Sequence, residues 1–299
     1  MFLRISLNFN CYILFRCLIN THINIIFIDD LKYISLQIYL RETWFAVKVR
    51  SNMRIQSGIE GFDELVQGGL VPERVYLLSG PPGSGKTTFG MQFLAQGATF
   101  GEVGLYVSLL ESPQNIINDM SNYSLNVATL IKMKKLLFAD LGPRMEYGYM
   151  DDLHEVISSD YEVSHSSVEG EAPSPAMVFK EIAAYVQEYN VKRLVIDSVS
   201  AIRFTTKDHG SEEKEMGRFI RNLKRIGCTT ILLSEMTDPN AYSTEQFAAH
   251  GVLFLHNFLY GKQMIRALQI IKMRGTKHDC NMRQLEFGER GLKVSSYLE

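Results

Sequence analysis

The run Gly80-Pro-Pro-Gly-Ser-Gly-Lys-Thr has the residue types and spacing that hold a triphosphate, because it fits the pattern G-x-x-x-x-G-K-[ST] in full. Glycines let successive backbone N–H groups turn toward phosphate oxygens, and a helix that starts here adds its N-terminal dipole. The lysine neutralises the β and γ phosphates, and the next hydroxyl is offered to Mg²⁺. The sequence therefore predicts that ATP and Mg²⁺ bind through Gly80, Gly83, Ser84, Gly85, Lys86, Thr87 and Thr88.

A second group on the metal side, in addition to the Thr87 hydroxyl, is expected where another buried strand ends. Lys192 and Arg193 precede the apolar run Leu-Val-Ile, which ends in Asp197. In open α/β sheets, ligands bind in the crevice at the carboxyl ends of parallel strands. We therefore expect Asp197 to orient Mg²⁺ through water beside Thr87. The alternative, that Asp197 only caps the following turn, stays open.

The stretch GLYVSLLESP, residues 104–113, is an apolar run that ends in a single carboxylate, Glu111. One interpretation is a general base that takes a proton from the attacking water. The other is an acid placed where a helix begins before Pro113, because the helix dipole favours negative charge in the first turn. The residues leave both interpretations open.

A scaffold of alternating strands and helices must position these residues. Short apolar runs predict strands at 75–79, 104–109, 136–139, the run that ends at Asp197, and 229–233. Helical spacing predicts helices at 87–99, 113–121, 176–189 and 211–227. This alternation predicts an α/β fold, with a mostly parallel central sheet flanked by helices on both faces. The C-terminal third alternates like antiparallel strands, at 251–259, 264–273, 283–287 and 291–295.

The remaining composition is that of an ordinary globular protein. Hydrophobic residues make up 46% and charged residues 21%, so a packed core is expected, and residues 141–175 are expected to form a long irregular loop. The formal net charge of -2 gives no general attraction to nucleic acid or to an anionic membrane. The four cysteines are scattered, which indicates reduced thiols in a cytoplasmic protein.

Residues 1–52 differ from the rest, because they contain no Gly and no Pro and have six Lys/Arg against three Asp/Glu. Their longest uncharged runs, 5–15 and 17–28, are shorter than the roughly 18–20 residues of a membrane-spanning helix. The small residues of a signal-peptide cleavage site are also missing. We expect a misassigned start before Met53 and an ATP-binding domain at 53–299. A genuine extension, membrane-associating or strand-forming, stays open.

Further motifs extend the pattern over the chain from about residue 53 to its end. They are IQSGIEGFDEL at 55–65, GGL at 68–70, SPQ at 112–114, IDS at 196–198 and KMRGTKH at 272–278. Together with the phosphate loop, this combination resembles the KaiC-like ATPases of the RecA superfamily, in their single-domain archaeal or bacterial form. The resemblance implies a RecA-like P-loop NTPase core that assembles into rings, usually hexamers, with ATP at the subunit interfaces.

The resemblance also assigns roles to residues near the C-terminus. In KaiC-like proteins a K-x-R-G-T segment reaches the triphosphate of the neighbouring subunit, and the matching residues here are Lys272, Arg274, Thr276 and His278. Cations supplied in trans stabilise negative charge in the transition state. Ser234, after the fourth core strand, matches a sensor of the γ phosphate. Two alternatives stay open: a basic turn on the surface, and pairing of His278 with Asp279.

The sequence departs from the family at the second strand. KaiC-like enzymes usually end this strand with two adjacent glutamates, and the first is taken as the base. Here Leu110 stands at the first position and Glu111 at the second, which should slow water activation by roughly 10²–10⁴-fold. We therefore expect a slow Mg-dependent ATPase that acts as an oligomeric regulatory or signalling switch, with catalytic residues Lys86, Glu111, Lys272 and Arg274.

Two other functions are compatible with the motifs. The first is a nucleotide-dependent scaffold that does not hydrolyse ATP and docks a protein partner that the sequence does not name. The second is an accessory ATPase of DNA repair or recombination. Residues 236–250, where RecA relatives have a DNA-contacting loop, contain no Lys or Arg, which disfavours nucleic-acid binding. Membrane binding is expected only if residues 1–52 are genuine.

Overall fold

The computed structural model describes residues 53–142, 163–165, 174–203, 209–236, 238–239 and 243–297. Arg54–Glu299 forms one compact unit. The extension and the start predicted at residues 1–52 lie outside the described residues. Within the described part of the chain, no helix has both the length and the apolar character needed to cross a bilayer.

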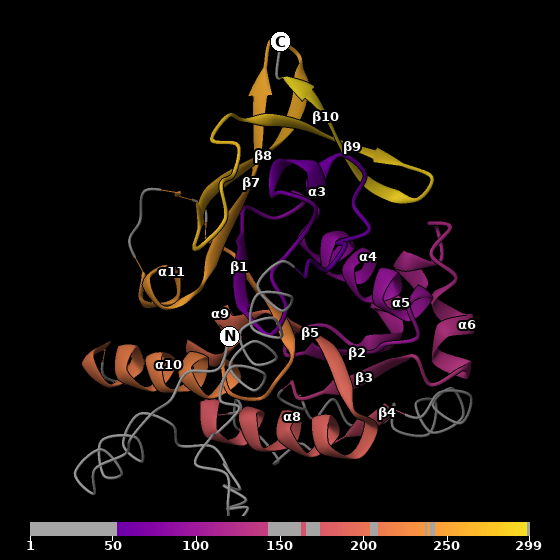
Figure 1. Ribbon diagram of the computed structural model, residues 1–299, viewed down its shortest axis with the longest axis vertical. Coiled ribbons are helices and arrows are strands. Elements are labelled where there is room, and N and C mark those ends of the chain that lie inside the picture. Colours follow the sequence, from indigo (N-terminus) through magenta and orange to yellow (C-terminus); the bar gives the residue numbers. More distant parts are fainter. Residues whose placement is uncertain are drawn as a thin grey trace, which may run out of the picture. The chain divides into compact units, whose positions relative to one another are not determined.

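The described strands form one sheet in the order β10-β9-β8-β7-β1-β6-β5-β2-β3-β4 (Figure 1). β1 (Val75–Ser79) lies between β6 (Thr229–Ser234) and β7 (Gly251–Tyr260) and pairs in parallel with both. From β6 the parallel pairing continues through β5 (Val191–Asp197), β2 (Val103–Ser108), β3 (Leu136–Asp140) and β4 (Val163–His165). Beyond β7 the pairing is antiparallel, through β8 (Gln263–Met273), β9 (Arg283–Gly288) and β10 (Gly291–Tyr297). The predicted sheet, mostly parallel with antiparallel strands toward the C-terminus, is confirmed.

Helices cover both faces of the sheet, because alternate residues of each strand point to opposite sides. Tyr76 and Leu78 of β1 belong to one apolar cluster, with α3 (Phe62–Leu65), α4 (Lys86–Thr99), α5 (Pro113–Met120) and α6 (Val127–Lys132). Val75 and Leu77 belong to the other, with α8 (Pro175–Tyr189), α9 (Val199–Arg203) and α10 (His209–Leu223). Figure 1 shows α4, α5 and α6 on one side of the sheet and α8 and α10 on the other.

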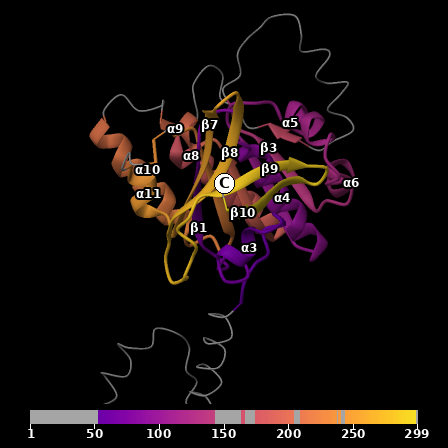
Figure 2. The ribbon, with the colours of Figure 1, turned by 90° about the horizontal axis from the view of Figure 1, so that it is seen from above.

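The helix that follows the phosphate loop, α4, is held by the core and by the last strand. Phe89, Met91 and Phe93 have no exposed surface, and burying each such side chain contributes about 1.5–3 kcal/mol. β10 lies alongside α4 (Figure 2), where Gln92 Nε2 donates to the Leu292 carbonyl at 3.0 Å and Gln92 Oε1 accepts from Leu292 N at 2.7 Å. The loop in front of α4 therefore starts from a fixed helix.

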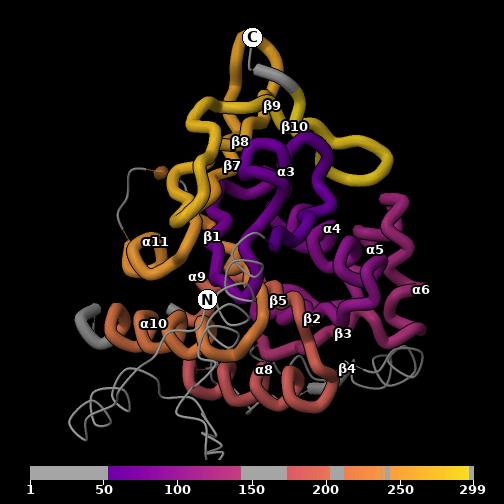
Figure 3. Tube along the Cα trace, in the orientation of Figure 1, coloured from indigo at the N-terminus to yellow at the C-terminus, as the bar shows by residue number. Residues whose placement is uncertain are grey.

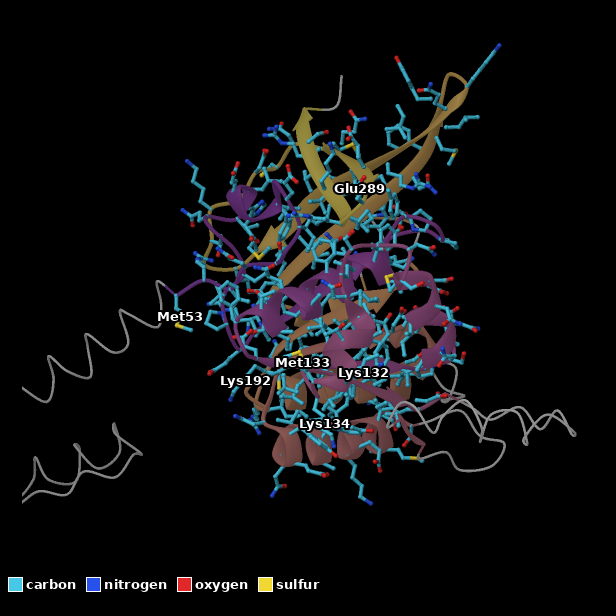
Figure 4. The ribbon with its side chains drawn as sticks, turned by 90° about the vertical axis from the view of Figure 1, so that its right-hand side faces the viewer. Met53, Lys132, Met133, Lys134, Lys192 and Glu289 are labelled. Atoms are coloured by element: carbon cyan, nitrogen blue, oxygen red, sulfur yellow. The ribbon has the colours of Figure 1, made fainter. Side chains whose placement is uncertain are left out.

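The N-terminal segment around α3 lies beside the last strand, β10 (Figure 3). Val294 N donates to the Glu60 carbonyl at 2.8 Å, and Glu60 forms an isolated bridge with Lys293. Nearby, Ser124 N donates at 2.8 Å to the carbonyl of Glu289, which Figure 4 labels on the β9–β10 turn. The C-terminal strands are thus joined both to the N-terminal segment and to the connection between α5 and α6.

Of the two basic residues near the start of β5, Lys192 is exposed (Figure 4) and Arg193 is buried. Arg193 Nε donates to Glu102 Oε2 at 2.6 Å, and Arg193 NH1 donates to the carbonyls of Gln56 and Phe93, each at 2.8 Å. A buried charge must be paired and hydrogen-bonded. These contacts join β5 to the N-terminal segment, to α4 and to the start of β2.

Several short elements lie where the sequence analysis expects none: α3, α6, α9, β4 and α11 (Thr244–Ala248). The expectation that all of residues 141–175 are irregular is wrong at β4, where Val163 pairs with Phe138 of β3. Residues 143–162 and 166–173 lie outside the described residues. Elements of three to six residues are too short to give a periodic pattern, which is why the sequence does not reveal them.

Candidate functional site

The phosphate loop, residues 80–85, connects β1 to α4 at the carboxyl edge of the parallel strands. Gly80 N donates to the carbonyl of Ser234, the last residue of β6, at 3.2 Å. A Cβ on Gly80 would lie 2.4 Å from the Leu255 carbonyl oxygen, so only glycine permits this close approach. Gly85 has a φ of 104°, which is in the left-handed region that favours glycine.

The start of α4 offers backbone donors beside a lysine. No side chain caps this helix and its first turn contains no acid, so its first N–H groups are available to an anion. Lys86 Nζ donates to the carbonyls of Gly80 at 2.8 Å and Pro81 at 3.0 Å, which holds the ammonium group over the loop. Burial lowers the pKa of Lys86, and the charges of Glu235 and Asp197 oppose that shift.

Thr87 and Asp197 meet at the mouth of the phosphate loop. Thr87 Oγ1 donates to Asp197 Oδ2 at 3.0 Å, so the start of α4 contacts the last residue of β5. A hydroxyl and a carboxylate are oxygen ligands of the kind that Mg²⁺ binds. The Ser84 hydroxyl is buried and has no hydrogen-bond partner among the described residues, whereas Thr88 is buried in α4. These groups fit a nucleotide phosphate with its magnesium ion.

A phenol that the sequence analysis does not single out also binds Asp197. Tyr106, on β2, has no exposed surface, and its hydroxyl donates to Asp197 Oδ2. Burial raises the pKa of Tyr106 well above its usual range, and the charge of Asp197 adds to this shift, so the hydroxyl is a lasting donor. Because Thr87 and Tyr106 belong to other elements, the Asp197 carboxylate faces the site and not the turn that follows it.

Glu111 lies in the bend between β2 and α5. β2 ends at Ser108, whose hydroxyl donates to the Glu111 carbonyl. Ser112 is the N-cap of α5, because its hydroxyl accepts from Asn115 N at 3.4 Å. Glu111 therefore precedes the cap. The helix-start interpretation expects it inside the first turn, but it lies outside that turn.

The Glu111 carboxylate interacts with the metal-side acid. Partial burial, and then the charges of Asp119 and Asp197, raise the pKa of Glu111. Its neighbour Leu110 is an apolar side chain with 59% of its surface exposed. One acid thus stands at the end of β2 where the family resemblance implies two.

Further polar residues join the site from β6, β7 and β8. Glu235 directly follows β6; its N–H donates to Ser200 Oγ at 3.2 Å, and its charge acts on Lys86. Arg266 Nε donates to the Gly83 carbonyl at 3.0 Å, while Asn257 Nδ2 lies 3.5 Å from the Pro82 carbonyl. The sequence does hold a signal for Glu235, because this residue directly follows Ser234 at the end of a strand. Arg266 has no such signal, because its place depends on the register of β7 and β8.

Lys272 and Arg274 lie at the opposite edge of the sheet from the phosphate loop of their own chain. Arg274 N donates to the His250 carbonyl at 2.8 Å, and His250 N donates to the carbonyl of Val75, the first residue of β1, also at 2.8 Å. The loop follows Ser79 at the other end of that strand, roughly 13 Å further on. The structure does not bring these two cations together with Lys86.

Both cations bind the C-terminal end of α11. Lys272 Nζ donates to the Gln246 carbonyl at 2.7 Å, and Arg274 NH2 donates to the Phe247 carbonyl at 3.1 Å. Burial, and then the charges of Arg274 and Lys224, lower the pKa of Lys272 to about 8. Cations at this end satisfy free carbonyls and complement the helix dipole.

Thr276 and His278 lie on the turn after β8. Arg54 NH1 donates to Thr276 Oγ1 at 2.8 Å, and His278 Nδ1 is 3.1 Å from the backbone carbonyl of Asp279. The Asp279 carboxylate instead forms an ion pair with Arg283. His278 thus contacts Asp279 through the backbone carbonyl and not through the carboxylate.

His250 lies among the cations of this edge. Burial, and then the charges of Lys224, Arg74 and Arg274, lower the pKa of His250 to about 4. Its Nδ1 accepts from Val75 N at 3.1 Å, a hydrogen bond that requires this nitrogen to be unprotonated. The backbone of β1 thus depends on a neutral imidazole.

This lowered pKa predicts that the protein loses stability as the pH falls. An unfolded histidine takes up a proton near pH 6.5, whereas folded His250 stays neutral down to about pH 4. Between these values only the unfolded chain gains the proton, which favours unfolding. Because His250 is partly exposed, we expect wild type to lose about 1 kcal/mol more than His250→Gln between pH 7 and pH 5. Urea denaturation measures this, and an equal loss in both proteins would contradict it.

The parallel sheet, the glycine-rich loop between β1 and a buried helix, and the acid at the end of a nearby strand define a P-loop nucleotide-binding domain of the RecA type. The family model of the KaiC ATPases matches residues 55–299. The chain therefore belongs to the KaiC ATPase family.

Individual relatives agree with this assignment. The circadian clock oscillator proteins KaiC of Thermostichus vulcanus and Synechococcus elongatus are 35% and 34% identical to the chain over 231 residues. These matches cover 75% of this chain but 41% of each relative, so the chain spans less than half of their length. The crystal structure of a KaiC-like protein from Pyrococcus horikoshii OT3 matches with a TM-score of 0.67 and 28% identity, covering 82% of this chain and 99% of that chain.

Proposed function

We propose that residues 53–299 form an ATP-binding domain that hydrolyses ATP slowly with Mg²⁺ and acts as a regulatory switch in a homo-oligomeric ring. The observation that carries the proposal is the 3.0 Å contact between Thr87 Oγ1 and Asp197 Oδ2 at the mouth of the phosphate loop. In P-loop enzymes a hydroxyl and a strand-end acid at this point hold the nucleotide's metal. A helix start that only bound an anion would not require the Asp197 carboxylate beside Thr87.

The phosphate loop binds and orients the triphosphate. Backbone N–H groups of the loop and of the first turn of α4 donate to phosphate oxygens, and Lys86 neutralises the β and γ phosphates. Thr87 would hold Mg²⁺, and Asp197 would orient it through water. The metal supplies charge neutralisation on the transferred phosphoryl group. We assign the sensing of the γ phosphate to Ser234, which is buried and whose carbonyl accepts from the Gly80 N–H at the start of the loop.

Glu111 is the acid that we assign to water activation. Its raised pKa makes it a better proton acceptor than an ordinary glutamate, and it interacts with Asp197 at the metal side. Leu110 accepts no proton, so a single acid does this work and turnover is slow. Glu235 is the other acid whose charge acts on Lys86, and it is the alternative base.

Lys272 and Arg274 complete the site of a second copy of the chain. Their side chains lie at the other end of β1 from the phosphate loop and are bound to α11, so they do not reach the nucleotide of their own chain. A head-to-tail arrangement of identical subunits brings one edge of a chain to the opposite edge of the next, and such contacts close into rings. This geometry couples hydrolysis to assembly.

A nucleotide-dependent scaffold is the second candidate function. It is favoured by Leu110, which leaves the end of β2 with one acid and an apolar side chain that is 59% exposed. In that case ATP stabilises the oligomer by mass action and is turned over little.

Two substitutions at the end of β2 test the proposal. Glu111→Gln should lower Mg-dependent phosphate release by at least about 10²-fold, because it removes the base. Leu110→Glu should raise the rate by about 10-fold or more, because it restores the second acid, and Leu110→Gln is its matched control without the charge. Since Leu110 is exposed, its replacement should change the folding free energy by less than about 0.5 kcal/mol.

The outcomes separate the candidates. If phosphate release is unchanged in Glu111→Gln but falls in Glu235→Gln, Glu235 is the general base and Glu111 is not. Release from wild type at the level of Lys86→Ala, with ATP-driven assembly retained, would replace the ATPase by the scaffold.

A further inference from the structure

Tyr106 links the strand β2 to the metal-side acid of the nucleotide site. Its ring is fully buried on the α4 face of the sheet, with its centroid 5.5 Å from that of Phe138. In the pairing of β2 with β5, Tyr106 lies opposite Val195, two residues before Asp197. The side chain therefore extends toward the carboxyl edge of the sheet, where its hydroxyl donates to Asp197 Oδ2.

The same carboxylate oxygen accepts a second hydrogen bond, from Thr87 Oγ1 at 3.0 Å. Donors from β2 and α4 together restrict the rotation of the carboxylate. The Thr87 hydroxyl also has to serve the metal, whereas the Tyr106 hydroxyl is enclosed in the core and has Asp197 as its bonded acceptor. Of the two donors to this carboxylate, Tyr106 is therefore the one whose oxygen is not also needed as a metal ligand.

We propose that Tyr106 is a positioning residue for the nucleotide's magnesium ion, because its hydroxyl holds the Asp197 carboxylate in the orientation that receives the metal's water ligands. The inference rests on the nucleotide site of the proposed function but not on hydrolysis. Tyr106 touches neither nucleotide nor metal and acts through Asp197. Loss of such a supporting hydrogen bond typically weakens metal affinity by about 10- to 100-fold.

Tyr76 provides a matched control. It is 1% exposed and belongs to the same apolar cluster, on β1. Its hydroxyl donates to the Val71 carbonyl at 2.9 Å and accepts from Val71 N at 2.8 Å. Tyr76→Phe therefore removes a buried phenol oxygen from the same core without touching Asp197. If loss of any buried phenol hydroxyl changed nucleotide binding, Tyr76→Phe and Tyr106→Phe would show the same change.

The test is the Mg²⁺ dependence of nucleotide binding, measured on the full chain with a fluorescent, non-hydrolysable ATP analogue. In Tyr106→Phe the Mg²⁺ concentration for half-maximal enhancement of binding should rise about 10-fold, while the affinity in EDTA stays that of wild type. Tyr76→Phe should keep the wild-type requirement. In an Asp197→Asn background, Tyr106→Phe should shift the requirement less than about twofold, because two residues that act through one group are not additive.

An unchanged Mg²⁺ requirement in Tyr106→Phe would overturn the inference, and so would an affinity loss of the same size with and without Mg²⁺. Phenylalanine keeps the ring packed on Phe138, and a circular dichroism spectrum equal to that of wild type verifies the fold. Because binding is measured without turnover, absence of ATP hydrolysis removes the proposed ATPase function and leaves this readout intact. Absence of nucleotide binding by wild type would remove both proposals.

Discussion

Arg274→Ala should lower ATP turnover by at least about 10³-fold, the range expected for an arginine supplied in trans to a phosphoryl-transfer site. In its own chain this guanidinium donates to the Phe247 carbonyl at the C-terminal end of α11, at the other end of β1 from the phosphate loop. Phosphate release at a protein concentration that favours assembly measures the effect. Arg74→Ala is the matched control, because Arg74 belongs to the same group of cations and donates to the backbone carbonyl of Arg274.

Mixing two inactive variants distinguishes a contact in trans from one within the chain. Arg274→Ala keeps an intact phosphate loop, and Lys86→Ala keeps an intact Arg274. If the guanidinium acts in trans, an equal mixture that exchanges subunits should recover roughly a quarter of wild-type turnover, since that share of head-to-tail interfaces pairs both intact residues. A mixture as inactive as its components would show that the site is completed within one chain.

Lys86→Ala should reduce kcat/KM for ATP by about 10³-fold or more, because a single ammonium group neutralises two phosphates. The loop should keep its fold, since its position is set by Gly80 and α4, and within the described part of the chain the lysine donates to the carbonyls of Gly80 and Pro81 alone. Binding of a fluorescent ATP analogue and phosphate release should fall together.

Lys192→Ala is the control for this loss, because it removes an exposed lysine near the start of β5, at the opposite end of that strand from Asp197. It should change neither binding nor turnover by more than about twofold. ATP affinity of Lys86→Ala equal to wild type would contradict the assignment of the phosphate site.

The parts of the site that follow from local sequence were predicted. The residues from Gly80 to Thr87 form a pattern that is complete within eight positions, and the strand before it and the helix after it are periodic enough to be recognised. Asp197 was predicted because parallel strands gather their carboxyl ends at one edge. Its 3.0 Å contact with Thr87 agrees with that reasoning.

Contacts that depend on register between distant strands were not predicted. Tyr106 reaches Asp197 because β2 and β5 pair with Tyr106 opposite Val195. Arg266 reaches Gly83 because β8 is in register with β7, which itself pairs with β1. Nothing near these residues in the chain specifies these pairings, which are decided when the whole sheet packs.

Lys272 and Arg274 show a different limit. Their residue types and spacing alone are those of a surface turn, and only the family resemblance pointed to a neighbouring subunit. The structure adds that both cations bind α11, a five-residue helix that is too short to give a periodic pattern in the sequence. A short helix of this kind forms because tertiary contacts hold it.

The position of β1 between β6 and β7 has a consequence for the synthesis of the protein. The phosphate loop leaves the ribosome early, but the strands that seat it, residues 229–234 and 251–260, follow later by more than 140 residues. At about 5–20 residues per second, the loop waits roughly seven to thirty seconds for β6 alone. ATP therefore has no formed site on a nascent chain that stops short of β7. Cellular nucleotide stabilises only molecules whose translation has passed that strand.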